Sequence, residues 1–249
     1  LYTPDNKNTY WLSTSRAIRT PSRSTDDIRL NLNARSVGGI PTLTSVFGSN
    51  KYQSEDLLAV EMGYRGAPAE DFSFDIAFFY NYYENLQTLE PSRTPFFEAS
   101  PSPLHLLVPL DFDNEARAKT YGVEISATFR PYDYWRLVAT YSYLDIDFDL
   151  HSDSGDTLTA VMEQQNPDNQ FMIRSHLDLS DNIEFDTLFR YVDALPSINV
   201  DSYFALDVRV AFKLCKDLTL SLVGQNLTEE GHKEFVATDF VLANAVDIE

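Results

Sequence analysis

The sequence predicts an all-β protein, an antiparallel transmembrane β-barrel of which this chain forms about nine strands. Three observations lead to this fold class. Apolar and polar residues alternate in many separate segments, short and long links alternate between those segments, and aromatic residues gather near the segment ends. The 249 residues include 14 tyrosines and 17 phenylalanines, which supplies the aromatic content that such a barrel needs at the two membrane surfaces.

Period-2 alternation is the clearest of these signals. A strand points successive side chains to opposite faces, whereas a helix would distribute the same residues all round its axis. We therefore expect one apolar face directed outward, one polar face, and no helix within these segments. Clear alternation occurs in Phe72–Tyr82, Tyr121–Arg130, Trp135–Tyr143, Ile183–Tyr191, Phe204–Phe212 and Leu218–Leu222, and weaker alternation in Tyr10–Ala17, Leu57–Arg65 and Gln170–Leu179.

The links between the segments alternate in length. Short links are expected at Gly66–Asp71, Pro131–Tyr134, Ser180–Asn182 and Lys213–Lys216. Long links are expected at Ile18–Ser54, Glu84–Asn114, Phe148–Asp168 and Val192–Val200. Tight turns at one end of the strands and long loops at the other are typical of outer-membrane barrels. A soluble sandwich mixes short and long links at both ends, so it is the less favoured architecture.

Aromatic residues mark the two ends of one expected strand. Trp135 follows a short link, and Tyr143 lies eight residues later, which corresponds to about 20 Å along the membrane normal in a tilted strand. Beyond Tyr143 the alternation changes phase, since Asp145, Asp147 and Asp149 take the positions that apolar residues held before. A β-bulge or a strand end that rises out of the bilayer would explain this, and we prefer the solvated strand end to a calcium site.

Composition excludes several classes of function. The net charge of −19 argues against a nucleic-acid partner, because phosphate binding needs a basic surface. Cys215 is the one cysteine, so no internal disulfide is expected. The four histidines, His105, His151, His176 and His232, share no ligand spacing, and we expect His176 to be a hydrogen-bonded lumen residue. The sequence therefore indicates no enzyme, no metal site and no cofactor.

Four motifs in order carry a family resemblance. Trp11–Ser22 contains Ser-Arg-Ala-Ile-Arg-Thr-Pro-Ser, Glu61–Arg65 reads Glu-Met-Gly-Tyr-Arg, Thr120–Glu124 reads Thr-Tyr-Gly-Val-Glu, and Gly224–Thr228 reads Gly-Gln-Asn-Leu-Thr. Together they resemble TonB-dependent outer-membrane receptors, and the part of the chain from Asn166 onward is similar to the C-terminal third of that family. The resemblance covers nearly the whole chain.

The resemblance implies a barrel of about 22 strands around an N-terminal plug. It implies uptake of a scarce ligand such as a ferric siderophore, energised by the TonB complex through the plug, across the bacterial outer membrane with its lipid and lipopolysaccharide. On this basis residues 1–249 are expected to be the C-terminal part of the barrel domain, without the plug and the last strand. An odd strand number agrees, since single-chain bacterial barrels close with an even number. The first and last strands would then each have an unpaired edge, which further chain or a partner would have to pair.

Candidate ligand contacts follow from loop aromatics, because binding residues concentrate on loops. These candidates are Tyr80, Tyr82, Tyr83, Phe96 and Phe97. We expect the lumen-facing charges to pair with each other or with the plug; they are Arg65, Glu124, Arg174, Glu184, Arg190, Asp207 and Arg209. Two alternatives stay open: a smaller outer-membrane barrel with a structural or adhesin role, and a soluble secreted β-sandwich that binds a ligand.

Overall fold

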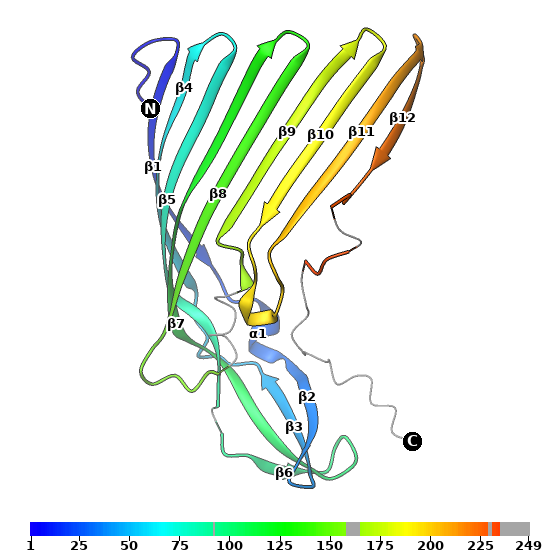
Figure 1. The fold of residues 1–249 in the computed structure, drawn as a ribbon. Helices are drawn as coiled ribbons and strands as arrows, with labels where there is room; N and C mark the ends of the chain where they lie inside the picture. The colour runs from blue at the N-terminus through cyan, green and yellow to red at the C-terminus, as the bar shows by residue number, and fades with distance from the viewer. Residues whose placement is uncertain (92, 158–164, 229–230, 235–249) are drawn as a thin grey trace.

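The fold is one curved antiparallel wall of nine strands, with a smaller strand extension at one end. The structure is a computed structural model, and it describes residues 1–91, 93–157, 165–228 and 231–234. In spatial order the wall consists of β1 (Asn8–Arg19), β4 (Glu55–Ala69), β5 (Phe72–Glu90), β7 (His105–Tyr132), β8 (Trp135–Leu150), β9 (Asn169–Ser180), β10 (Ile183–Val192), β11 (Tyr203–Cys215) and β12 (Leu218–Gly224). Figure 1 shows these strands side by side, each wall neighbour antiparallel to the next. The predicted strand number and fold class are confirmed.

The pairing register places the alternating residues on two separate faces of the wall. One row joins Met62, Phe78, Val123 and Tyr143 across four neighbouring strands. A second row joins Arg65, Asp75, Ser126 and Thr140. It is shifted along the strands by three residues, an odd number, so its side chains lie on the other face. Because the pleat alternates strictly, correct register gives one continuous apolar face and one continuous polar face.

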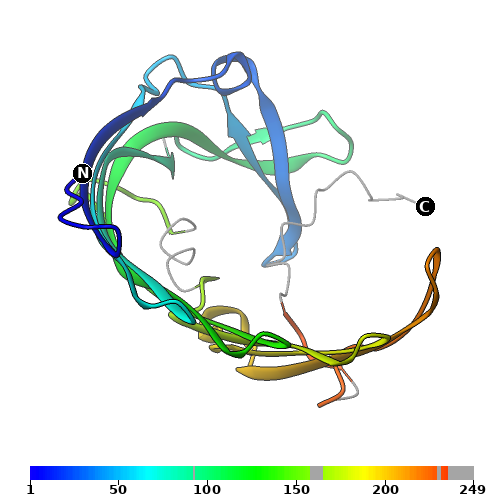
Figure 2. The ribbon, with the colours of Figure 1, turned by 90° about the horizontal axis from the view of Figure 1, so that it is seen from above.

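The polar face is the concave one. Figure 2 shows the wall bent like part of a cylinder, and the hollows on its inside are lined chiefly by the polar set. The apolar set therefore projects from the convex side, where Phe78 is 52% exposed and Leu222 is 74% exposed. A soluble sandwich would cover such side chains with a second sheet, and the described residues form no second sheet over this face. The sandwich alternative is wrong.

The short and long links lie at opposite ends of the strands, as predicted. The two-residue turns between β4 and β5, β7 and β8, β9 and β10, and β11 and β12 gather at the upper end in Figure 1. They are Glu70–Asp71, Asp133–Tyr134, Asp181–Asn182 and Lys216–Asp217. The long links, including the described parts of the link between β8 and β9, lie at the lower end. We call these the turn end and the loop end.

Two of the predicted long links are not plain loops, which corrects the expectation from the sequence. The first contains helix α1 (Arg23–Asp27), strand β2 (Arg29–Val37) and strand β3 (Ile40–Phe47). The second contains β6 (Phe96–Glu98), while β5 and β7 both extend far past the expected strand ends. Strand β3 pairs with β7 in parallel, so the sheet is not antiparallel throughout. The sheet continues beyond the wall because the backbones of these segments hydrogen-bond to one another: β2 pairs with β3, and both β3 and β6 pair with β7.

We define the loop-end extension as β2, β3, β6 and the first part of β7. Several apolar residues of this extension are buried. Leu107 on β7 is fully buried and pairs with buried Leu43 on β3, while Val46 on β3 and Leu32 on β2 are buried as well. They contrast with the exposed apolar residues of the convex wall.

The geometry of strand β8 explains why acidic residues take the apolar positions of the alternation after Tyr143. The β7–β8 register shifts only near the turn, so β8 passes Tyr143 without a bulge. Asp147 and Asp149 remain on the convex face, opposite Lys119 and Arg117 of β7. Their side chains form ion pairs of 3.8 Å and 3.2 Å across the strands. The convex face thus changes from apolar to charged within one straight strand, as expected of a strand end that rises into water.

The final strand is shorter than expected. Strand β12 ends at Gly224, two residues past the alternation of Leu218–Leu222, whereas the last strand was expected to continue to Leu227. Asn226 has a left-handed backbone with φ 52°, and the Leu227 amide donates to the Leu206 carbonyl at 2.9 Å. The left-handed residue turns the chain out of the β12 ladder and back against β11. The sequence also predicts that this strand runs outward and that the tail from Thr228 lies outside the barrel, but most of that tail is not among the described residues. A short 3₁₀ turn, Pro196–Ile198, lies in the link before β11.

Candidate functional site

The concave wall carries a connected group of charges near the turn end. Arg209 on β11 donates hydrogen bonds to Glu184 at 3.2 Å and to Asp186, both on β10. Lys213 forms a second ion pair with Glu184 at 2.8 Å. His176 on β9 hydrogen-bonds Asp186 and confirms the expected hydrogen-bonded lumen histidine. These groups lie close together because they are cross-strand neighbours on one face of the wall, although they are up to 37 positions apart in sequence (His176 to Lys213).

Further ion pairs span the same face. Arg65 on β4 pairs with Asp75 on β5 at 2.6 Å, and Arg190 pairs with Asp207 at 3.5 Å. Of the lumen charges expected from the sequence, Arg65, Glu184, Arg190, Asp207 and Arg209 therefore have partners within the wall. The other two, Glu124 and Arg174, make no hydrogen bond or ion pair with the part of the chain that the structure describes.

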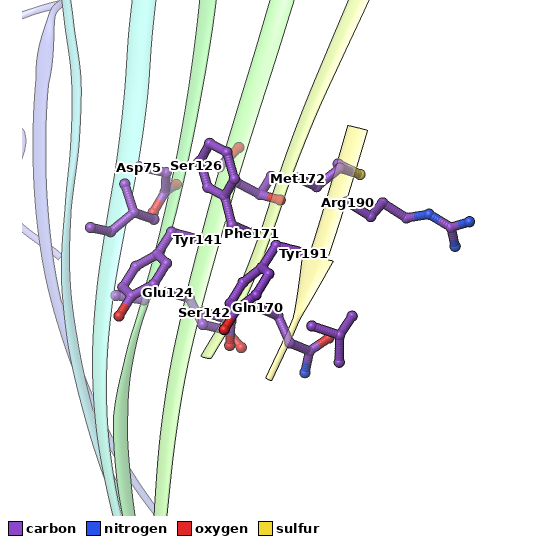
Figure 3. A pocket seen from close by; sticks show the side chains of 14 residues that line it. Asp75, Glu124, Ser126, Tyr141, Ser142, Gln170, Phe171, Met172, Arg190 and Tyr191 are labelled. Carbon is purple, nitrogen blue, oxygen red and sulfur yellow. The ribbon is translucent and has the colours of Figure 1, made fainter. Parts of the chain in front are cut away.

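A hollow of about 570 Å³ lies on the wall between β5 and β10. Figure 3 shows Asp75, Glu124, Ser142, Gln170 and Arg190 among the side chains that line it. Carboxylates, amides, hydroxyls and a guanidinium all meet the same open space. The surface can therefore bind a polar partner by hydrogen bonds, and it provides no enclosed apolar cavity.

The loop-end extension holds a second polar cluster. Arg29 on β2 donates to Glu98 on β6 through both guanidinium Nη atoms, one at 3.0 Å. The pKa of the Glu98 carboxyl lies below its ordinary value, because Arg29 hydrogen-bonds its charged form. Buried His105 lies 3.7 Å from the same carboxylate and contacts the Pro103 carbonyl at 2.8 Å through Nδ1. This cluster ties β2 to β6 and β7.

The extension also presents a cation–aromatic group. The guanidinium carbons of Arg29 and Arg93 lie 5.2 Å and 4.5 Å from the ring centre of Phe47. Arg93 also pairs with Asp111 at 3.0 Å. Sequence reasoning missed this group because it treated both segments as loops. The alternation of Leu30 and Leu32 with polar neighbours was the signal that could have revealed β2.

The five aromatic candidates do not converge on one place. Tyr80 and Tyr82 lie on the convex face of β5, opposite Val60 and Leu58 of β4. Tyr83 lies on the concave face of the same strand. Phe96 and Phe97 lie on β6 in the loop-end extension, where they are 43% and 60% exposed. Only Phe96 and Phe97 combine exposure with a position away from the membrane-facing wall.

No helix among the described residues has the length and apolar content needed to cross a membrane. No group of three or more His, Cys, Asp or Glu side chains in the same residues has a metal-binding arrangement. The site chemistry visible in the described chain is thus one of ion pairs, hydrogen bonds and aromatic contacts.

A curved antiparallel sheet with an apolar convex face, a polar concave face, short turns at one end and long links at the other defines an outer-membrane barrel protein. Residues 1–227 match the family model described as TonB dependent receptor-like, beta-barrel. The chain belongs to this family. The predicted resemblance is confirmed.

Solved structures share the fold. The ferric enterobactin receptor PfeA of Pseudomonas aeruginosa is 13% identical, with a TM-score of 0.65 over 91% of this chain and 33% of its own. The siderophore receptor PirA of Acinetobacter baumannii is 14% identical, with a TM-score of 0.66 over 92% of this chain and 36% of its own. The ferric-catecholate import receptor Fiu of E. coli K12 is 13% identical, with a TM-score of 0.61 over 91% and 29%.

The chain spans about a third of the length of these solved receptors. A comparison with curated proteins finds no match. The family and the solved neighbours are transport receptors rather than enzymes.

Proposed function

We propose that this chain is part of an outer-membrane receptor that takes up a scarce ligand, such as a ferric siderophore, with energy from the TonB complex. The match of the family model over residues 1–227 is the observation that carries this proposal. The solved neighbours are named as receptors for ferric enterobactin, for ferric catecholates and for alcaligin, and two structures of PfeA variants contain enterobactin. A bacterial outer-membrane location follows from the same proposal.

The shape of the wall supports the assignment of residues 1–249 to the C-terminal part of a barrel domain. Among the described residues, β1 and β12 each have one wall neighbour, β4 and β11. Apart from a bridge between Tyr2 and Tyr10 of β1, the other edge of each strand presents backbone groups that a hydrocarbon environment cannot satisfy. Within the proposal, further strands of the barrel pair with these two edges, and the plug occupies the concave side. No observation favours the smaller structural or adhesin barrel over this assignment.

Ligand contacts are proposed at the loop end. Phe96 and Phe97 project from β6, close to the Arg29–Glu98 ion pair and to the Phe47 cation–aromatic group. Exposed aromatic rings beside guanidinium groups suit a ligand that carries both flat rings and negative charge. Tyr80 and Tyr82 are less suited, because they project from the convex face and therefore point out of the barrel.

Uptake under iron limitation tests the proposed function. A strain that lacks the complete gene would be supplied with a panel of radiolabelled ferric siderophores, in the presence and absence of an active TonB complex. We expect the gene to restore accumulation of at least one member of the panel, and expect that accumulation to disappear without TonB. Accumulation that is independent of TonB would contradict the energised mechanism. Restored cell adhesion without any uptake would favour the structural alternative.

A further inference from the structure

A hollow of about 430 Å³ lies in the loop-end extension, between the β2–β3 hairpin and the segment that joins β6 to β7. The hairpin contributes Pro41 and Leu43 to its lining, and the joining segment contributes Pro101 and Pro103. We call this the proline hollow. Proline rings are apolar and rigid, so little order has to be imposed on these walls when a guest binds. Such walls suit a flat ring of a small molecule.

A buried histidine holds the proline segment in place beside this hollow. The side chain of His105 lines the hollow and is only 6% exposed. Its Nδ1 donates to the Pro103 carbonyl at 2.8 Å, because a carbonyl oxygen can only accept. Its Nε2 has no hydrogen-bond partner among the described residues, and the Glu98 carboxylate lies 3.7 Å away. A buried polar atom without a partner is uncommon, and a bound group is one explanation for it.

The charge at the proline hollow is opposite in sign to that of the whole chain. The chain has 38 acidic and 19 basic residues, yet none of the described residues that line this hollow is an aspartate or a glutamate. Arg35 lines it, and the Arg35 side chain makes no hydrogen bond or ion pair with the described part of the chain. Three other hollows each contain at least two acidic side chains. Of these four hollows, the proline hollow is therefore the one that favours a negatively charged guest.

Asn31 adds a neutral donor to the same hollow. Its Oδ1 accepts a hydrogen bond from the Ser45 hydroxyl at 2.7 Å, which fixes the orientation of the amide. The Nδ2 group is then left to donate to a guest. Arg35 and Asn31 together suit a ring that carries one acidic group and one further oxygen. The volume lies in the lower part of the range for small-molecule pockets, so it suits one ring rather than a complete ferric siderophore.

We propose that the proline hollow binds a single aromatic ring that carries a carboxylate or an ionised hydroxyl group. The ring packs on the prolines, Arg35 binds the negative charge, and Asn31 donates to the further ring oxygen. The ring is either a free aromatic acid or one arm of a larger ferric ligand, since both present the same chemistry. This inference rests on the proposed function only in placing the loop end outside the membrane, where such molecules arrive.

Binding of salicylate to the full-length protein in detergent tests this ring site. Salicylamide, a neutral probe of the same size, is titrated in parallel, and both are followed by ligand-observed NMR. We expect saturable binding of salicylate and roughly tenfold weaker binding of salicylamide, because a charge-assisted hydrogen bond is stronger than a neutral one. Arg35→Gln should weaken salicylate binding by about the same factor, and Arg35→Lys should recover most of the loss. Arg23→Gln, at an exposed arginine that does not line the hollow, is the control and should bind both probes normally.

A second pair of variants locates the bound probe. Ala34→Leu narrows the hollow without changing its charge, so it should weaken salicylate and salicylamide to a similar extent. Asn33→Leu, at the neighbouring exposed residue of β2 that does not line the hollow, should leave both affinities unchanged. Equal affinity of the two probes for the unmodified protein would overturn the proposal. Unchanged binding in both Arg35→Gln and Ala34→Leu would overturn it as well, because the probe would then bind elsewhere.

Competition identifies the source of the ring. Displacement of salicylate by a ferric siderophore that the receptor imports would assign the hollow to an arm of that ligand, whereas simultaneous binding would assign it to a free aromatic acid. Both results support the ring site. Uptake reports on the proposed function independently. A receptor that imports a ferric siderophore but shows no preference for salicylate over salicylamide would contradict the ring site alone. A protein with that preference but without TonB-dependent uptake would contradict the proposed function alone.

Discussion

Val210 of β11 lies directly opposite Leu222 of β12, and both side chains project from the convex face, while the adjacent pair Ala211 and Ser221 projects from the concave face. Adjacent residues of one strand share depth and backbone pairing and differ mainly in face. We therefore expect Leu222→Arg to destabilise the barrel in lipid by about 2–4 kcal/mol, and Ser221→Arg to cost far less. Denaturant titration of the full-length protein in liposomes measures both. Equal costs would mean that the two faces meet the same environment.

The position along the strand decides which convex residue is the best probe. Leu220 lies three residues after the Lys216–Asp217 turn, so it is close to the membrane surface. Val208 pairs with Thr187 near the middle of β10. Val208→Arg should therefore destabilise the protein more than Leu220→Arg, since the cost of a charge falls toward the membrane surface. The same titration measures this order.

Truncation of the buried residue Leu107 should affect the loop-end extension independently of the wall. Leu107→Ala removes a fully buried side chain and is expected to destabilise the extension by about 2–5 kcal/mol. Leu104 is 60% exposed, so Leu104→Ala serves as the control and should have little effect. Hydrogen exchange at neutral pH, read on peptides from β2, β3 and β6, gives the local stability. Similar exchange in both variants would show that Leu107 is not a core residue.

Acid should loosen the junction between β2 and β6. Hydrogen bonds from Arg29 lower the pKa of Glu98, so the carboxylate contributes stability that is complete above the unfolded-state pKa of about 4.3 and is lost as the pH falls through the lower folded-state value. Cleavage of the extension by pepsin, an acid-active protease, should therefore accelerate as the pH is lowered below this range.

The variant Glu98→Gln removes the titrating group of this junction. Its pepsin cleavage rate should be high throughout and should lack the acid-dependent acceleration. Asp27→Asn, at an exposed residue with one ion pair of 3.8 Å to Arg23, is the control and should behave like the unmodified protein. An unchanged pH profile in Glu98→Gln would assign the acid response to another group.

Aromatic truncation separates the two groups of ligand candidates. Under the proposed function, Phe97→Ala should weaken ligand binding by about tenfold, because an exposed ring at the loop end contributes roughly 1–2 kcal/mol to such a contact. Tyr82→Ala should leave the affinity unchanged, since Tyr82 faces outward and donates to Glu84 at 3.0 Å. Equilibrium binding of a labelled ferric siderophore to the full-length receptor measures both. A loss confined to Tyr82→Ala would reverse the assignment.

The sequence by itself determined the wall. Strict alternation in segments such as Phe72–Tyr82 and Phe204–Phe212 fixes which side chains share a face, because a strand has a period of two whatever its neighbours are. The lengths of the links then separate the turn end from the loop end. These local properties need no knowledge of distant partners, which is why the fold class could be predicted. The family was predicted separately, from the resemblance of four motifs.

Only the tertiary structure decided what happens beyond the wall and on the concave face. The extension depends on β3 pairing in parallel with β7, about 60 positions later in the chain, and the local sequence of β3 gives no sign of such a partner. In the same way, alternation predicts that Arg174 and Arg209 face the lumen. Whether each finds an acid depends on register across strands: Arg209 meets Glu184 and Asp186, whereas Arg174 meets Val138 and Leu188.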